Sequence, residues 1–119
     1  MELDDFWADK YPANINREVD VNVYATLIDL FKDSCGKYAN KPAFSHEGST
    51  LSFAQLDKYS ASFAAWLQRH TDLKQGDRVA VQLPNMLQFP IAVFGALRAG
   101  LIVVNTSTLY TAAEMEYQF

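Results

Sequence analysis

The sequence has few of the residues that build disulfides and metal centres. It contains one cysteine, Cys35, so it can form neither an intramolecular disulfide nor a zinc site made of several thiolates. Its two histidines, His46 and His70, have no ligand-like partner at the spacing of a metal site. We therefore expect no metal centre, and we interpret Cys35 as a packed thiol on the apolar face of a helix.

Motifs of phosphate binding and nucleophilic catalysis are also missing. The five glycines are isolated from one another, whereas a phosphate-binding loop needs several close together so that backbone N–H groups can approach the anion. No Gly-x-Ser-x-Gly, His-Glu-x-x-His or Cys-x-x-Cys pattern occurs. Motif reasoning therefore assigns no catalytic, cofactor-binding or metal-binding residue.

Basic residues are outnumbered, 10 against 14 acidic ones, and the net charge of -4 argues against a nucleic-acid partner. No apolar run approaches the roughly 20 residues that span a bilayer, so we expect no transmembrane segment. The acidic start of the chain is unlike a secretory signal. With 50% hydrophobic residues the chain can bury a core, and we expect a cytoplasmic protein.

The first part of the chain is predicted to form an arm, a helix and a hairpin. Residues 1–22 carry no sustained hydrophobic period, which predicts an irregular N-terminal arm with a helical turn near Phe6. Apolar side chains three and four positions apart predict a helix from about 23 to 39. Residues 43–46 and 49–51 are predicted to pair as a hairpin around Glu47-Gly48. The apolar positions of the predicted helix are Leu27, Leu30, Phe31, Cys35 and Tyr38.

A second helix is predicted to follow the hairpin. Ser52 and Gln55 have the spacing of a capping box, which indicates a helix that begins here and continues to about His70. Its large side chains recur at helical spacing, so we expect them to face the core. They are Leu56, Tyr59, Phe63, Trp66 and Leu67.

The second half of the chain predicts a βαβ unit and hence an α/β fold. We expect strands near 78–83 and 101–105, with a helix over about 86–99 between them. The second strand is uninterrupted in its apolar residues, which is typical of a parallel strand covered on both faces. Asn85 and Gln88 have the spacing of a helix cap.

Two glycines in this unit have distinct predicted roles. Gly95 lies in the middle of the predicted helix at a propensity cost of about 1 kcal/mol, so we expect a neighbouring element to approach its backbone closely. Gly100 fits the left-handed position after a helix end.

One polar segment, Asn105–Thr111, directly follows the predicted apolar strand. In open α/β sheets, ligands bind beyond the carboxyl ends of parallel strands, so its residues Asn105, Ser107, Thr108 and Tyr110 are the candidate ligand contacts. The alternative is a plain connector in which Thr111 caps the next helix, with Glu114 as its capping-box partner.

Several segments together resemble the adenylate-forming superfamily. Residues 73–85 read L-K-Q-G-D-R-V-A-V-Q-L-P-N, which is similar to the L-K-x-G-D-R-V-A-x-x-x-P-N segment of acyl-CoA synthetases. Residues 51–56 resemble that superfamily's L-[ST]-[YF]-x-x-L helix start, and residues 7–13 with 41–44 are similar to bacterial long-chain fatty-acid–CoA ligases. The resemblance covers essentially all 119 residues. It departs at Ser107-Thr108, where relatives usually have Asn-Pro.

The resemblance implies an ATP-dependent, AMP-forming ligase. Such enzymes use ATP and magnesium to convert a fatty acid to an acyl-adenylate, from which coenzyme A then displaces AMP. The family's catalytic motifs lie downstream of the region matched here. We therefore expect residues 1–119 to be an incomplete, N-terminal portion of an AMP-binding domain that serves as scaffold and binds no cofactor tightly.

Other interpretations stay open. The chain could be a non-catalytic assembly module that keeps only the superfamily scaffold, or part of a ligase for a medium-chain or aryl acid. The resemblance also suggests a fatty acid as the partner of the parent enzyme and peripheral contact with the inner face of the membrane. Because a βαβ face needs cover, we expect the segment to self-associate.

Overall fold

The computed structural model describes residues 6–119, so the first five residues of the predicted arm lie outside the described part. The described chain is a mixed α/β structure with two small sheets, as the sequence predicts. Its elements are η1 (Ala8–Lys10), α2 (Leu27–Lys37), β1 (Pro42–His46), β2 (Ser49–Ser52), α3 (Phe53–His70), β3 (Arg78–Val81), α4 (Gln88–Arg98), β4 (Ile102–Asn105) and α5 (Ala112–Gln118).

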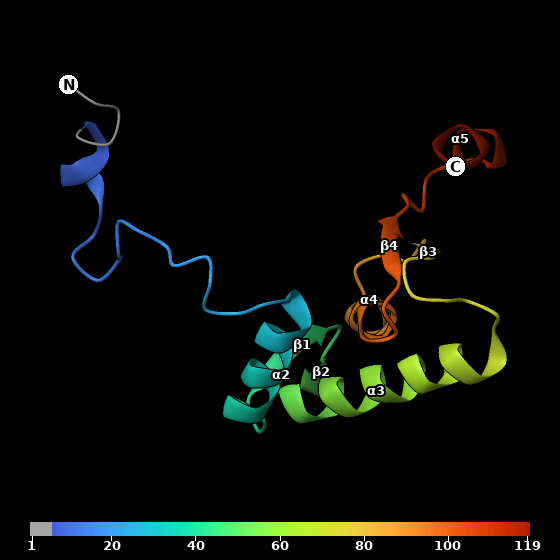
Figure 1. The fold of residues 1–119 in the computed structure, drawn as a ribbon, viewed down its shortest axis with the longest axis horizontal. Helices are drawn as coiled ribbons and strands as arrows, with labels where there is room; N and C mark the ends of the chain where they lie inside the picture. Colours follow the sequence, from blue (N-terminus) through green and yellow to red (C-terminus); the bar gives the residue numbers. More distant parts are fainter. Residues whose placement is uncertain (1–5) are drawn as a thin grey trace.

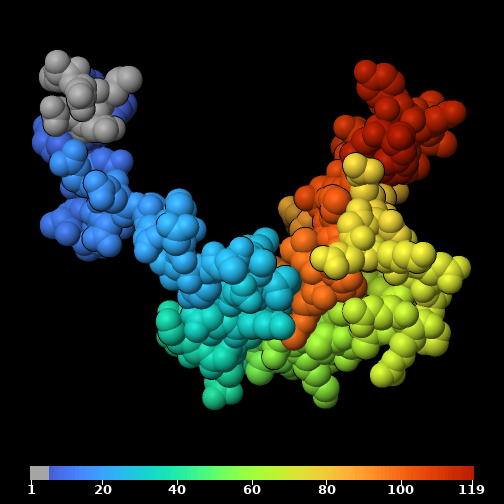
Figure 2. All heavy atoms as spheres, in the orientation of Figure 1, coloured from blue at the N-terminus to red at the C-terminus, as the bar shows by residue number. Residues whose placement is uncertain are grey.

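Residues 6–26 and helix α5 project from opposite ends of a packed body formed by α2, α3, α4 and the strands (Figures 1 and 2). The radius of gyration is 18.3 Å, whereas a compact chain of this length would have about 13 Å. Residues 11–26 form neither helix nor strand. The Tyr24 hydroxyl donates to Asp33 Oδ2 at 2.5 Å, which raises the pKa of Tyr24 and ties the end of this segment to α2.

Helix α2 begins at Leu27, and the prediction of a start near residue 23 is wrong. Thr26 sets the boundary because its hydroxyl accepts the Asp29 N–H, while the Asp29 carboxylate accepts the Thr26 N–H. This capping box satisfies backbone groups that would otherwise lack partners at the helix start. Of the predicted apolar face, Phe31 and Cys35 are buried, whereas Leu27, Leu30 and Tyr38 stay exposed.

The hairpin and the start of α3 confirm their predictions. Strands β1 and β2 are antiparallel, with His46 opposite Ser49. Glu47 and Gly48 have φ values of 47° and 79°, the left-handed conformations that a two-residue hairpin loop requires. Helix α3 begins at Phe53 behind the reciprocal Ser52–Gln55 capping box.

The predicted inward face of α3 is confirmed for Leu56 and Leu67, which are buried, and for Phe63, which packs against the core, but not for the other two residues. Tyr59 and Trp66 are 43% and 51% exposed. The face that packs inward also carries the small residues Ser60 and Ala64, and at the crossing with α4 the Phe63 ring fits because it meets Gly95, which has no side chain. The buried residues of α3 are Leu56, Ser60, Ala64 and Leu67.

Strands β3 and β4 are parallel, with Arg78 opposite Ile102 and Val81 opposite Asn105. This confirms the predicted βαβ unit, although β3 ends at Val81, two residues before the predicted end. The prediction that the second strand is covered on both faces is wrong for the described residues. Val79 and Val103 pack against the core, whereas Ile102, which faces the opposite side, is half-exposed.

Helix α4 begins at Gln88 without a side-chain cap, so the predicted Asn85–Gln88 cap is wrong. Its end confirms the prediction for Gly100, which has φ 81°. The Gly100 N–H donates to Leu97 O and the Leu101 N–H donates to Ala96 O, both at 3.0 Å. This Schellman arrangement closes the helix and directs the chain straight into β4.

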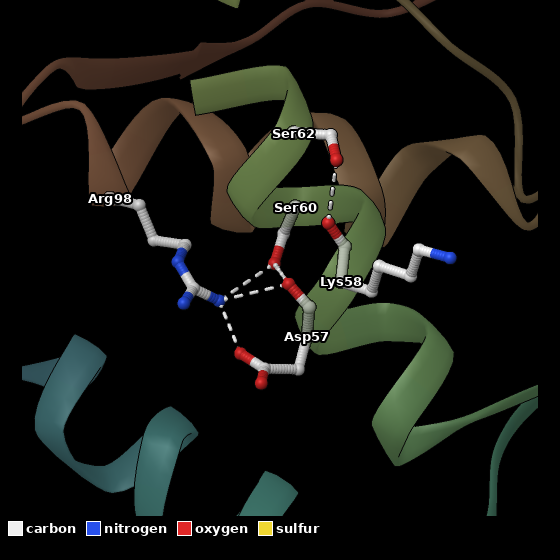
Figure 3. A network of polar contacts seen from close by, with 5 residues as sticks. All are labelled: Asp57, Lys58, Ser60, Ser62 and Arg98. Atoms are coloured by element: carbon white, nitrogen blue, oxygen red, sulfur yellow. Dashed lines mark hydrogen bonds and ion pairs between the residues drawn. The ribbon is translucent and has the colours of Figure 1, made fainter. Parts of the chain in front are cut away.

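Gly95 lies where α4 crosses α3, as its position in the sequence predicts. A Cβ atom there would be 2.6 Å from Phe63 Cδ1 and 3.1 Å from Ser60 O. Beside it, Arg98 Nη1 donates to Asp57 Oδ1 at 2.6 Å, to Ser60 Oγ at 3.0 Å and to Asp57 O at 3.2 Å (Figure 3). The crossing therefore combines a tight apolar contact with a partly buried ion pair.

Gly95→Ala should lower the free energy of unfolding by about 1 to 3 kcal/mol, because overpacking outweighs the gain in helix propensity. Gly36→Ala in α2 is the matched control, since nothing lies within 4 Å of a Cβ atom there. It should stabilise the chain by about 0.5 to 1 kcal/mol. Urea unfolding of both variants measures the difference, and equal stabilities would contradict a tight α3–α4 crossing.

Candidate functional site

The candidate site lies where β3 and β4 both leave the sheet at their carboxyl ends. The parallel register places Val81 beside Asn105, so the segments that follow them emerge side by side. The Thr106 N–H donates to Val81 O at 3.0 Å and extends the ladder by one residue. Polar residues after β4 are thereby held at the edge where open α/β sheets bind ligands.

Of the four predicted contact residues, Asn105 is the last residue of β4 and the other three lie in the loop that follows it. Asn105 O accepts Gln118 Nε2 at 3.2 Å, which ties the end of α5 to the end of β4. Ser107 is the first residue of a turn, and its hydroxyl accepts the Leu109 N–H at 3.2 Å. Thr108 is exposed, and Tyr110 is partly exposed beside α5.

The end of the loop has the capping role that we considered as the alternative. Thr111 Oγ1 accepts the Glu114 N–H, and Glu114 Oε2 accepts the Thr111 N–H at 2.7 Å. This capping box begins α5 at Ala112. Capping by Thr111 and ligand contact by the preceding residues are compatible, because the cap uses neither Ser107 nor Tyr110.

Sequence reasoning missed two residues of the site. Thr106 is buried, and its hydroxyl donates to Val104 O at 3.4 Å, so it anchors the loop to the sheet. Gln82 follows β3 directly and donates from Nε2 to Ser107 O at 2.9 Å. The signal for Gln82 was its position, since a polar residue just past one parallel strand lies beside the residue just past the next.

One open hollow lies beside the loop, and another lies beside the segment that follows β3. One has a volume of about 470 Å³ and is lined by Tyr110, Ala113, Glu114, Tyr117 and Gln118. The other, of about 310 Å³, lies between the β1–β2 hairpin and the segment that leads into α4. The walls of both hollows are mainly apolar. Both hollows therefore suit contact with a substrate more than bond breaking.

The remaining candidate groups have structural surroundings. Cys35 is 3% exposed. Burial raises the pKa of its thiol, the Asp57 charge raises that pKa further, and Arg98 partly offsets both. Within residues 6–119, no group of three or more His, Cys, Asp and Glu side chains could hold a metal ion. In the same part of the chain, no helix is long and apolar enough to cross a membrane.

The sequence of this chain is similar to those of known proteins. Residues 31–119 match the family described as AMP-binding enzyme. The chain is 47% identical over 112 residues to a long-chain-fatty-acid–CoA ligase of Escherichia coli O6:H1, which covers 94% of this chain and 20% of that protein. It is 46% identical over 116 residues to the corresponding ligase of Yersinia pestis, covering 98% of this chain and 21% of that protein. The chain thus spans about a fifth of the length of the curated relatives it matches.

A solved structure shows the same fold. The anthranilate CoA ligase AuaEII, in complex with anthranoyl-AMP, superposes with a TM-score of 0.73 at 22% sequence identity. The match covers 81% of this chain and 18% of that chain. At this identity the likeness concerns the fold alone.

Cys35 should react with iodoacetamide at least about tenfold more slowly in the native chain than in denaturing urea, since the thiolate is the nucleophile.

The raised pKa of Cys35 also predicts that the stability of the chain depends on pH. Below the ordinary thiol pKa both states are protonated, whereas above it the unfolded chain ionises first and stability falls.

Cys35→Ala is the control for the pH effect and should remove this alkaline loss of stability. Urea unfolding across pH 7 to about 10 measures it. Equal alkylation rates in the native and denatured chains would contradict the packed thiol.

Proposed function

Because this chain belongs to the AMP-binding enzyme family, we propose that it forms the N-terminal scaffold of a ligase that activates a long-chain fatty acid with ATP and transfers the acyl group to coenzyme A. The observation that carries this proposal is the 47% identity, over 94% of the chain, to a long-chain-fatty-acid–CoA ligase. On this proposal, residues 1–119 are part of a larger AMP-binding domain, and residues 1–22 are an arm outside its packed body.

The proposed reaction has two displacement steps. A fatty-acid carboxylate oxygen attacks the α-phosphorus of ATP, forming the acyl-adenylate and releasing pyrophosphate. The sulfur of coenzyme A then attacks the acyl carbonyl carbon and releases AMP, which gives the thioester. Phosphoryl chemistry of this kind depends on positioning and on charge stabilisation, which magnesium supplies when bound to the phosphates. Residues 6–119 offer no cluster that fits a magnesium ion, so we assign no ligand for it here.

The contribution proposed for this segment is structural support and one wall of a substrate channel. Asn105, Ser107, Thr108 and Tyr110 are the proposed wall residues. The fixed position of their loop at the carboxyl edge of the sheet supports this assignment. ATP and coenzyme A are proposed as substrates of the whole ligase, with no tight binding by this segment alone.

The location and assembly of the protein are also proposals. We place it in the cytoplasm, with peripheral contact at the inner face of the membrane, where a long-chain fatty acid partitions. The half-exposed Ile102 and the exposed Trp66 support self-association of the isolated segment, since burying exposed apolar side chains against another copy removes them from water. The same surface would serve a non-catalytic assembly module, which is the second candidate function.

An acyl-CoA assay separates the two functions. The longer polypeptide that carries this segment should form palmitoyl-CoA only when palmitate, ATP and coenzyme A are all present, whereas residues 1–119 alone should form none. Octanoate and benzoate serve as matched substrates for the medium-chain and aryl alternatives. Activity of residues 1–119 alone would overturn the scaffold role, and an inactive longer polypeptide would overturn the ligase.

A further inference from the structure

The turn that follows β4 is organised around Ser107. Its carbonyl oxygen accepts the Tyr110 N–H at 3.2 Å, and its hydroxyl accepts the Leu109 N–H at 3.2 Å. Both bonds are local and fix the shape of the turn. The Gln82 Nε2 bond to the same carbonyl, at 2.9 Å, comes from 25 positions away. It therefore fixes where the turn lies relative to strand β3.

The register of the sheet explains why Gln82 can reach this carbonyl. Val81 and Asn105 are paired, and the Thr106 N–H bonds to Val81 O. Gln82 is thus the first residue past the end of one strand, and Ser107 is the second residue past the end of the other. A primary amide suits this gap because it donates an N–H without bringing a charge to the sheet edge.

Beside the exposed polar residues Ser107 and Thr108, the turn presents two large, mainly apolar side chains. Leu109 is 87% exposed and Tyr110 is 41% exposed. Residues 105–111, N-T-S-T-L-Y-T, include no lysine, arginine or histidine, so the loop itself supplies no cation for the phosphates of ATP or coenzyme A. Of the proposed substrates, the hydrocarbon chain of the fatty acid fits such a surface best.

We propose that Gln82 is a positioning residue that holds the Ser107–Tyr110 turn so that Leu109 and Tyr110 form an apolar wall for the acyl chain. The bond from Gln118 to Asn105 O supports the same loop from the α5 side. The acyl assignment rests on the proposed ligase function, whereas the positioning of the turn rests on the hydrogen bonds alone.

Amide hydrogen exchange of the 119-residue chain tests the positioning. Gln82→Met keeps the length of the side chain but removes the donor, and it should speed exchange of the Leu109 and Tyr110 amides by roughly two- to tenfold, as expected for one lost exposed hydrogen bond. Gln82→Lys restores a donor and should keep exchange close to wild type. Gln68→Met, at an exposed position of α3, is the control and should change nothing at the turn. Unchanged exchange in Gln82→Met would overturn the positioning role.

Kinetics of the proposed full-length ligase test the acyl assignment. Gln82→Met should raise KM for palmitate by roughly three- to tenfold, leave kcat and KM for ATP unchanged, and affect octanoate less, since uniform binding of a long chain is lost. Gln82→Lys should restore KM. A wild-type KM for palmitate in Gln82→Met would overturn the apolar wall. An inactive wild type would overturn the ligase function and the acyl assignment together, while the exchange data still decide whether Gln82 holds the turn.

Discussion

Helices α3 and α4 cross so closely that a Cβ atom at the crossing, on Gly95, would lie 2.6 Å from the Phe63 ring. The body of the structure depends on this contact. Leu67, Ala96 and Leu101 form one buried cluster that joins the crossing to the sheet. On the other side, Phe94 stacks on Phe31 of α2 with ring centroids 4.0 Å apart. The two crossing helices thus contribute to two buried clusters, one beside α2 and the hairpin and one beside the parallel strands.

The crossing also determines where the candidate site lies. Arg98 is the last residue of α4, and its guanidinium donates to Asp57 and Ser60 of α3 (Figure 3). These bonds fix the position of the last turn of α4 relative to α3. Gly100 then turns the chain directly into β4, whose carboxyl end carries the Asn105–Thr111 loop. Arg98 can therefore affect the position of the loop although it lies far from it. Its ion pair with Asp57 restricts the movement of α4, the helix that leads into β4.

Most local signals in the sequence predicted local structure correctly, although those for the Asn85–Gln88 cap and the start of α2 did not. The Ser52 and Thr111 capping boxes, the Glu47-Gly48 turn and Gly100 each depend on a few adjacent residues, and the structure confirms all of them. The βαβ unit was predictable from the order of its segments, a strand, a helix and a strand within about 28 residues. The buried face of α3 was predicted only in part, because helical spacing cannot tell which flank of the apolar stripe meets a neighbour. Ser60 is fully buried while Trp66 is half-exposed, a reversal that follows from the approach of α4. Likewise the role of Gln82 depends on the strand register, which brings together residues 25 positions apart.

The coupling between Asp57 and Arg98 is the most direct test of the claim that the α3–α4 crossing holds this structure together. A double-mutant cycle with Asp57→Asn and Arg98→Met, followed by urea unfolding, isolates that coupling from the other effects of each substitution. Arg98 is largely buried and Asp57 is about half-exposed. The predicted coupling free energy is therefore about 1 to 2 kcal/mol, intermediate between the values for exposed ion pairs and for buried ones. Additive effects of the two substitutions, within about 0.3 kcal/mol, would contradict the account.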